Sequence, residues 1–224
     1  MKVFSIRHGE QLFPHNNEGK KLICGVDASL VELGKQQMQE LGREFIRNGI
    51  VLDAIYRSPL LRAAESANEL ADGQTVQQYV IEDLKETFPN SGEGHSYDEL
   101  EERGGDIYAH PFSPDQETLD HLVKRSREAA RRILADAKEY GFESIAIIGH
   151  GDPLCALDWV LRHEGQPASY AAMRDSYYPQ KAQAKEYHLN SDLVLESEGR
   201  IITTEAATQS IEGFRNVGNT EAKI

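Results

Sequence analysis

The sequence has few cysteines and no long apolar run. Cys24 and Cys155 are too few for the disulfide framework of a small secreted domain, and they lack the spacing of a metal site. No stretch approaches the roughly 18 apolar residues of a membrane-spanning helix, and the first residues lack the apolar core of a signal peptide. We therefore expect a cytoplasmic protein in a reducing compartment.

Positive charge is also scarce. The 224 residues include 24 Lys and Arg against 37 Asp and Glu, so the formal net charge at pH 7 is −13. A protein with this charge repels nucleic acids and anionic membranes at long range, and we expect neither as a partner. A small phosphorylated substrate is compatible with it, provided that cations gather in one local pocket. The chain length suits a single domain with a sizeable core.

Three short apolar runs each end in a basic cluster. The runs at residues 3–6, 51–56 and 145–148 have the length and composition of buried strands. They lead into Arg7-His8-Gly9-Glu10, Arg57-Ser58-Pro59-Leu60-Leu61-Arg62 and Gly149-His150-Gly151. If the strands are parallel, these clusters meet at the carboxyl edge of one sheet, where open α/β sheets bind their ligands. Two arginines and two histidines at that edge favour a site for a dianion.

His8 and Arg62 have the clearest chemistry in these clusters. The fixed charge of Arg7 should lower the pKa of the His8 imidazole and keep the ring neutral near pH 7, and a neutral imidazole is a nucleophile. Ser58 and Pro59 are typical of the start of a helix. They place Arg62 about one turn inside it, where an anion gains from both the guanidinium and the helix N-terminus. An isolated Arg-His pair is more often a surface pair, so this interpretation depends on the clusters meeting.

Four segments resemble the histidine phosphatase superfamily, which has the phosphoglycerate-mutase-like fold, and within it the phosphatase branch. They are Arg7-His8-Gly9-Glu10, Ser58-Pro59-Leu60-Leu61-Arg62-Ala63, Glu86 and His150-Gly151. The resemblance covers residues 1–203 and implies an α/β fold, a three-layer sandwich whose mostly parallel central sheet is flanked by helices on both faces. We expect one catalytic domain at 1–203, with an insertion at 95–115 as a lid or wall, and a polar C-terminal tail at 204–224.

The resemblance also implies roles for individual residues of this sequence. His8 would be the nucleophile that forms a phosphohistidine, and Glu86 would be the proton donor. Arg7, Arg62 and His150 would be catalytic ligands of the phosphate. Further phosphate contacts are implied for Gly25, Gly151 and Asn16.

Two of these assignments depart from the pattern of the family. The family commonly has Asn where this sequence has Pro14, so Asn16 or Asn17 is a substitute, and both are equally typical of a turn. Glu86 lies in the pattern Leu-x-Glu with Gly94 eight residues later, but Gly92 stands where the family usually has an aromatic residue. The alternative acids are Glu82 and Glu93.

Hydrophobic periodicity predicts the elements around these motifs. We expect helices at 33–47, 97–102, 116–140 and 153–161, a strand at 76–81, and a hairpin within 184–203 that turns near Asn190-Ser191 and returns after Glu198-Gly199. The basic residues of the third helix are Lys124, Arg125, Arg127, Arg131 and Arg132. Salt bridges to Glu128 and Asp136 explain this run more simply than a nucleic-acid surface does.

We interpret the chain as a metal-independent phosphomonoesterase without a cofactor, which acts through a phosphohistidine on a small phosphate ester. The alternatives are a cofactor-dependent phosphotransferase of the phosphoglycerate-mutase type, a non-catalytic protein that binds phosphorylated ligands, and a metallohydrolase. The insertion offers only Arg103 as a further basic contact, which disfavours a mutase. The histidines lack metal-ligand spacing, and Gly149-His150-Gly151 lacks the third glycine of a dinucleotide motif. No pattern in the sequence indicates the identity of the substrate or the oligomeric state.

Overall fold

The structure is a computed structural model that describes residues 1–23, 27–71, 73–87, 94–163 and 169–209. Its centre is a six-stranded sheet with the strand order β3-β2-β4-β1-β5-β6. The strands are β1 (Lys2–Arg7), β2 (Ala54–Arg57), β3 (Gln77–Val80), β4 (Ser144–Gly149), β5 (Ala184–Leu189) and β6 (Leu195–Ile202). The first four are parallel, whereas β5 is antiparallel to β1 and β6 is antiparallel to β5. The predicted, mostly parallel sheet is confirmed.

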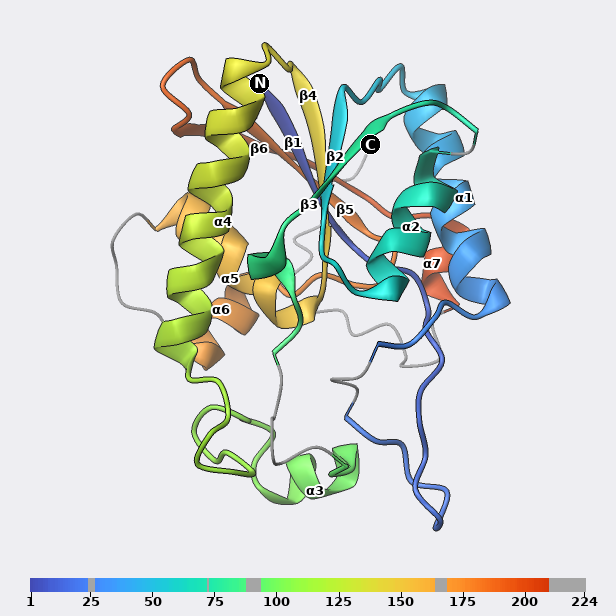
Figure 1. Ribbon diagram of the computed structural model, residues 1–224, viewed down its shortest axis with the longest axis vertical. Helices are drawn as coiled ribbons and strands as arrows, with labels where there is room; N and C mark the ends of the chain where they lie inside the picture. Colours follow the sequence, from blue (N-terminus) through green and yellow to red (C-terminus); the bar gives the residue numbers. More distant parts are fainter. Residues whose placement is uncertain (24–26, 72, 88–93, 164–168, 210–224) are drawn as a thin grey trace.

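Helices cover both faces of this sheet (Figure 1). On one face lie α1 (Glu32–Arg47) and α2 (Leu61–Ala71), with the short α7 (Glu205–Thr208) packed against α1. On the other face lie α4 (Leu119–Glu139), α5 (Gly151–Arg162) and α6 (Tyr170–Ser176). The predicted three-layer sandwich is therefore confirmed. Within the described ranges, no helix is long and apolar enough to cross a membrane.

Two apolar clusters bury the two faces of the sheet. Successive side chains of a strand point to opposite faces, so Val3 and Ile145 pack with α4 and α5, whereas Phe4 and Ile148 pack with α1 and α2. Both faces of β1 and β4 are thus buried. This burial explains why the two strands are almost continuously apolar rather than alternating with polar residues.

The turn after β1 lies directly against α1. A Cβ atom on Gly9 would lie 2.3 Å from the carbonyl oxygen of Gly34, and a Cβ atom on Gly34 would lie 2.0 Å from the carbonyl oxygen of Glu10. Only glycine fits at these two positions. The glycine of the Arg-His-Gly triplet therefore allows the close approach that seats α1 behind the turn.

Two segments lie beyond the carboxyl ends of the parallel strands (Figure 1). One follows β1, and the other contains α3 (Tyr97–Glu102). They are joined by hydrogen bonds from the Ile23 N–H to the His95 carbonyl, at 2.9 Å, and from the Tyr97 N–H to the Lys21 carbonyl, at 3.1 Å. We call these two segments, residues 11–23 and 94–118, the cap.

The predicted start of the return strand is wrong, and the elements expected from 51 and from 116 begin three residues later, at Ala54 and Leu119. The return strand β6 begins at Leu195 rather than after Gly199. Gly199 lies inside β6, where a Cβ atom would lie 2.8 Å from Cγ of Glu186 on β5, and the register between the two strands shifts near this point. The glycine therefore marks a close contact between strands instead of a turn. The turn itself lies at the predicted Asn190, whose side-chain oxygen accepts from two backbone N–H groups.

Candidate active site

Strand register places two histidines opposite each other. β1 and β4 are neighbours in which Arg7 pairs with Gly149, and the His8 N–H donates to the Gly149 carbonyl at 3.1 Å. His8 and His150 directly follow these paired residues, and their ring centroids lie 5.0 Å apart. Both side chains are buried. The parallel pairing of β1 and β4 therefore brings together two imidazoles that are far apart in the sequence.

Arg62 of α2 connects the two imidazoles. Its side chain is 1% exposed, and its Nε lies 3.3 Å from His8 Nε2 and 3.2 Å from His150 Nδ1. The Ser66 hydroxyl donates to the Arg62 carbonyl and accepts from the Gly9 N–H, so α2 is tied to the turn after β1. The site thus has a buried guanidinium at its centre.

Hydrogen bonds indicate which nitrogen of each imidazole carries the proton. His8 Nδ1 lies 2.7 Å from the Gly9 carbonyl oxygen, so Nδ1 holds the proton and Nε2 keeps its lone pair. In His150, Nδ1 accepts from Arg62, and Nε2 therefore donates to the Ser58 hydroxyl at 2.8 Å. Burial, and then the charge of Arg62, hold the pKa of each ring well below its usual value of 6.5. Both rings are consequently neutral at neutral pH.

Arg7, the last residue of β1, is the second cation of the site. Its Nη1 donates to the Pro179 carbonyl at 3.3 Å, and its guanidinium carbon lies 5.6 Å from the centroid of the Tyr178 ring. After burial and Arg62, the charge of Arg7 is a further cause of the low pKa of both histidines. The positive charges of Arg7 and Arg62 therefore both act on the two imidazoles.

Glu86 lies two residues after the short 3-10 helix η1 (Glu82–Leu84) and is half-buried. Its Oε1 accepts from the Thr87 N–H at 3.0 Å. Burial, and then the charge of Asp152, raise the pKa of Glu86 from 4.5 to about 7, while Arg62 and Arg7 act in the opposite direction. A carboxyl group with this pKa is partly protonated near neutral pH, as a general acid must be.

Of the two glycines assigned to the phosphate, the structure describes one, Gly151. Gly151 begins α5 directly after His150, and a Cβ atom there would lie 2.2 Å from the Tyr178 hydroxyl. A side chain at this position would therefore displace the Tyr178 ring. Gly25 lies outside the described residues.

The remaining assigned positions lie at the surface, in the cap or outside the described ranges. The side-chain oxygen of Asn16 accepts from the N–H groups of Glu18 and Lys20, at 3.0 and 2.9 Å, and so shapes a turn of the cap. A contact of Asn16 with phosphate stays a prediction. Of the alternative acids, Glu82 is exposed and forms an ion pair with Lys85 at 2.6 Å, whereas Glu93 lies outside the described residues.

Asp152 is a candidate residue of the active site that the sequence analysis missed. It is 8% exposed and accepts hydrogen bonds from the hydroxyls of Tyr108 at 2.8 Å, Tyr170 at 3.0 Å and Tyr178 at 3.2 Å. Tyr108 also contacts the Thr87 hydroxyl at 2.7 Å, next to Glu86. Thr87 thus contacts both Glu86, through its backbone N–H, and the tyrosine that binds Asp152, through its hydroxyl. The one available signal in the sequence is the position of Asp152, two residues after His150.

The site has a neutral imidazole nitrogen, two guanidinium groups and a carboxyl group with a raised pKa. His8 supplies a neutral nitrogen, Arg7 and Arg62 can bind a dianion, and Glu86 can donate a proton. No group of three or more His, Cys, Asp and Glu side chains in the described part of the chain is arranged to hold a metal ion.

Comparison with known proteins gives the family. Residues 3–173 match the histidine phosphatase superfamily (branch 1), and the chain belongs to this superfamily. The matched range contains His8, Arg62, Glu86 and His150. The resemblance in the sequence motifs is therefore confirmed.

Three relatives illustrate the range of this family. A Hydrogenobacter thermophilus protein with the provisional name phosphoserine phosphatase 2 is 29% identical over 168 residues, 71% of this chain and 78% of its own. The 2,3-bisphosphoglycerate-dependent phosphoglycerate mutase 2 of Latilactobacillus sakei is 29% identical over 133 residues, 58% of this chain and 56% of its own. The solved structure of Entamoeba histolytica phosphoserine phosphatase in complex with 3-phosphoglyceric acid has a TM-score of 0.66 at 24% identity and covers 92% of this chain and 98% of that chain.

Proposed function

We propose that this chain is a metal-independent phosphomonoesterase that acts through a phosphohistidine on a small phosphate ester. The contact of Arg62 Nε with both His8 Nε2 and His150 Nδ1 carries the proposal. It supports the proposal because a neutral imidazole nitrogen lies beside a buried cation, which is the combination that attack on a phosphate dianion requires. Membership of the superfamily supports the same reaction.

The first half-reaction transfers the phosphoryl group to the protein. Arg7, Arg62 and His150 neutralise the dianion, with Gly25, Gly151 and Asn16 as further proposed contacts. His8 Nε2 attacks phosphorus in line, so a phosphorus–nitrogen bond forms as the bond to the ester oxygen breaks. Glu86 donates its proton to the departing alkoxide, which leaves as an alcohol.

The second half-reaction regenerates His8. Glu86 is now a carboxylate and takes a proton from the attacking water. The phosphorus–nitrogen bond breaks, inorganic phosphate is released, and the Glu86 carboxyl group is protonated for the next cycle. The same residue thus serves as acid and then as base.

We propose that the substrate is a small monoester handled in the cytoplasm. The formal net charge of −13 disfavours polyanionic substrates, because any negative groups that extend beyond the local basic site are repelled by the protein. Relatives from Hydrogenobacter thermophilus and Entamoeba histolytica are named for phosphoserine. Phosphoserine is therefore the first physiological compound to assay.

The Latilactobacillus sakei relative favours a second candidate, in which His8 returns the phosphoryl group to another hydroxyl. Arg103 is the one Lys or Arg residue in the insertion. Its Nη1 donates to the Pro111 carbonyl at 3.2 Å, and its guanidinium carbon lies 4.6 Å from the Phe112 ring centroid. Arg103 thus has partners inside the cap, which supports the hydrolase.

The proposal is tested by incubating the protein with p-nitrophenyl phosphate, phosphoserine and 3-phosphoglycerate, with and without a chelator. We expect release of inorganic phosphate that the chelator does not change. Conversion of 3-phosphoglycerate to its 2-phospho isomer without phosphate release would indicate the mutase. Absence of turnover of all three compounds would leave only a binding protein, and loss of activity on chelation would contradict metal independence.

A further inference from the structure

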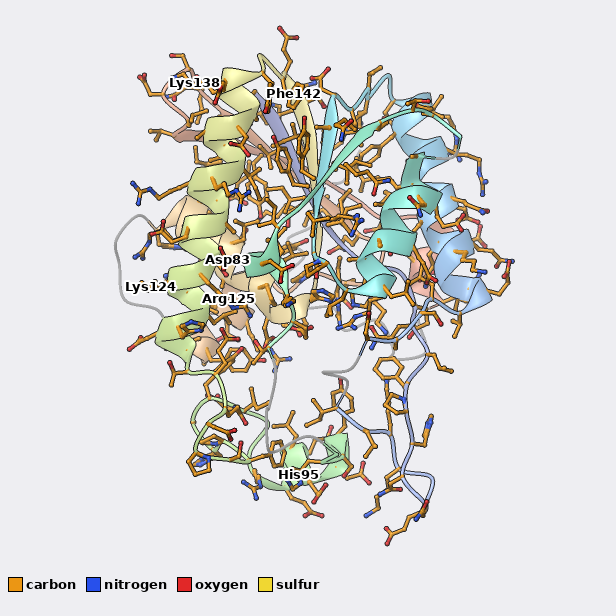
Figure 2. All side chains as sticks on the ribbon, in the orientation of Figure 1. Asp83, His95, Lys124, Arg125, Lys138 and Phe142 are labelled. Carbon is orange, nitrogen blue, oxygen red and sulfur yellow. The ribbon has the colours of Figure 1, made fainter. Side chains whose placement is uncertain are left out.

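Arg125 does not pair as the sequence analysis expects for the basic residues of α4. Arg131 forms the expected ion pair with Glu128, at 3.5 Å, and both side chains are exposed. Arg125 instead reaches from α4 toward the segment that contains Asp83, as Figure 2 shows. Its side chain is 10% exposed, so it belongs to the interior of the molecule rather than to a solvated face.

Four hydrogen bonds hold the Arg125 guanidinium. Its Nη1 donates to the carbonyl oxygens of Asp83 and Lys85, both at 2.7 Å. Its Nε and Nη2 donate to the two carboxylate oxygens of Glu117, at 2.6 and 2.8 Å. Glu117 is itself 11% exposed and also lies 2.6 Å from His121 Nδ1. This is the fork geometry in which arginine and carboxylate fix each other most firmly.

The two carbonyls that Arg125 binds lie just before Glu86. Asp83 belongs to η1, and Lys85 is the residue at which η1 ends and the chain becomes extended. Carbonyls at the end of a helix lack partners within the helix, and Arg125 supplies them. On the other side of Glu86, Thr87 donates its N–H to the carboxylate. The acid is therefore held by contacts on both sides.

We propose that Arg125, oriented by Glu117, is a positioning residue that places Glu86 for proton transfer to the leaving group. The inference depends on the proposed role of Glu86 and adds a residue outside the phosphate site. Lysine cannot replace Arg125 fully, because one ammonium group lacks the planar fork that binds two carbonyls and both carboxylate oxygens.

The test uses a series of substituted phenyl phosphates, from phenyl phosphate to p-nitrophenyl phosphate, and measures kcat/KM for each. This parameter reports transfer to His8 and therefore protonation of the leaving group. In the R125Q variant, we expect a loss of about 10- to 100-fold for phenyl phosphate but less than about 3-fold for p-nitrophenyl phosphate, whose leaving group needs little protonation. The dependence on leaving-group basicity becomes steeper.

Matched variants separate positioning from a general loss of stability. R131Q removes the same charge from an exposed position on α4. In this variant the slope of log kcat/KM against the leaving-group pKa should equal that of the wild type. E117Q should steepen the slope in the same direction as R125Q. The loss of kcat/KM for phenyl phosphate in the R125Q/E117Q double variant should be smaller than the product of the two single losses. If R125Q does not fold, R125K provides the test with a smaller change in slope.

The outcomes are distinguishable. An equal loss for all leaving groups, or a wild-type slope in folded R125Q or R125K, would overturn the positioning role of Arg125. A wild-type protein that hydrolyses none of the phenyl phosphates would instead overturn the proposed phosphomonoesterase.

Discussion

The carboxyl edge of the sheet and the cap beyond it are built in different ways. At the edge, paired strands place His8 and His150, which are buried around Arg62. In the cap, a few hydrogen bonds join the two segments, and the Phe13 ring centroid lies 3.4 Å from Nζ of Lys21 in the cap and 4.2 Å from Nζ of Lys181, a buried residue outside the cap. From this difference we propose that the edge carries the chemistry and that the cap selects the substrate.

The largest effect is expected from the nucleophile. The H8A variant should lower kcat by about four orders of magnitude or more, because both proposed half-reactions pass through the His8 nitrogen. The loss should be similar for every phosphate ester, since His8 lies at the edge of the sheet and not in the cap. Phosphate release from p-nitrophenyl phosphate and phosphoserine measures it. Substantial turnover by folded H8A would show that the edge of the sheet does not supply the nucleophile.

A smaller loss is expected for the buried cation. The R62K variant keeps the charge but lacks the planar fork, and we expect it to cost about 2–4 kcal/mol, or about 30- to 900-fold in kcat/KM. The exposed R131K variant is the control and should match the wild type. The measurement is kcat/KM for p-nitrophenyl phosphate in variants with unchanged circular dichroism. An R62K variant as active as the wild type would remove Arg62 from the site chemistry.

The acid gives a pH-dependent effect. In the proposed first step Glu86 donates a proton, and burial and Asp152 raise its pKa to about 7, so kcat/KM for phenyl phosphate should fall about tenfold per pH unit above pH 7. The D152N variant removes the second cause of the raised pKa and should move this fall to lower pH. Profiles of the two proteins between pH 5 and about pH 9 check the shift. A flat profile would exclude Glu86 as the acid.

The smallest effects are expected in the cap. The F13L variant removes an aromatic ring that two cations contact, and each such contact is worth about 0.5–2 kcal/mol. We expect KM values to change by about 3- to 10-fold, to different extents for different esters, while p-nitrophenyl phosphate keeps its kcat. Uniform loss of kcat would show that the cap contributes to the chemistry.

The strands and the basic edge could be predicted because their signals are local. The apolar run before His8 and the run before His150 each indicate a buried strand, and parallel pairing then brings their ends together. Glu86 needed the family pattern, since an acid in a carboxylate-rich segment has no local mark that separates it from Glu82. The structure separates them by burial and by the Lys85 partner of Glu82.

The supporting contacts could not be predicted because they join distant segments. The three tyrosines around Asp152 come from the cap, α6 and the segment after α6, and nothing in their spacing points to a shared partner. Arg125 looked like one of five basic residues on a solvated helix. Only the packing of α4 against η1 shows that it binds the backbone before Glu86.

The most direct test of the account is to trap the covalent intermediate. The protein is mixed with radiolabelled phosphate ester, quenched within one turnover and digested, and the labelled peptide is sequenced. The account predicts label on His8 that is stable in alkali and lost in acid, and no label in H8A. Acid-stable label, label on another residue, or phosphate release without any labelled protein would contradict it.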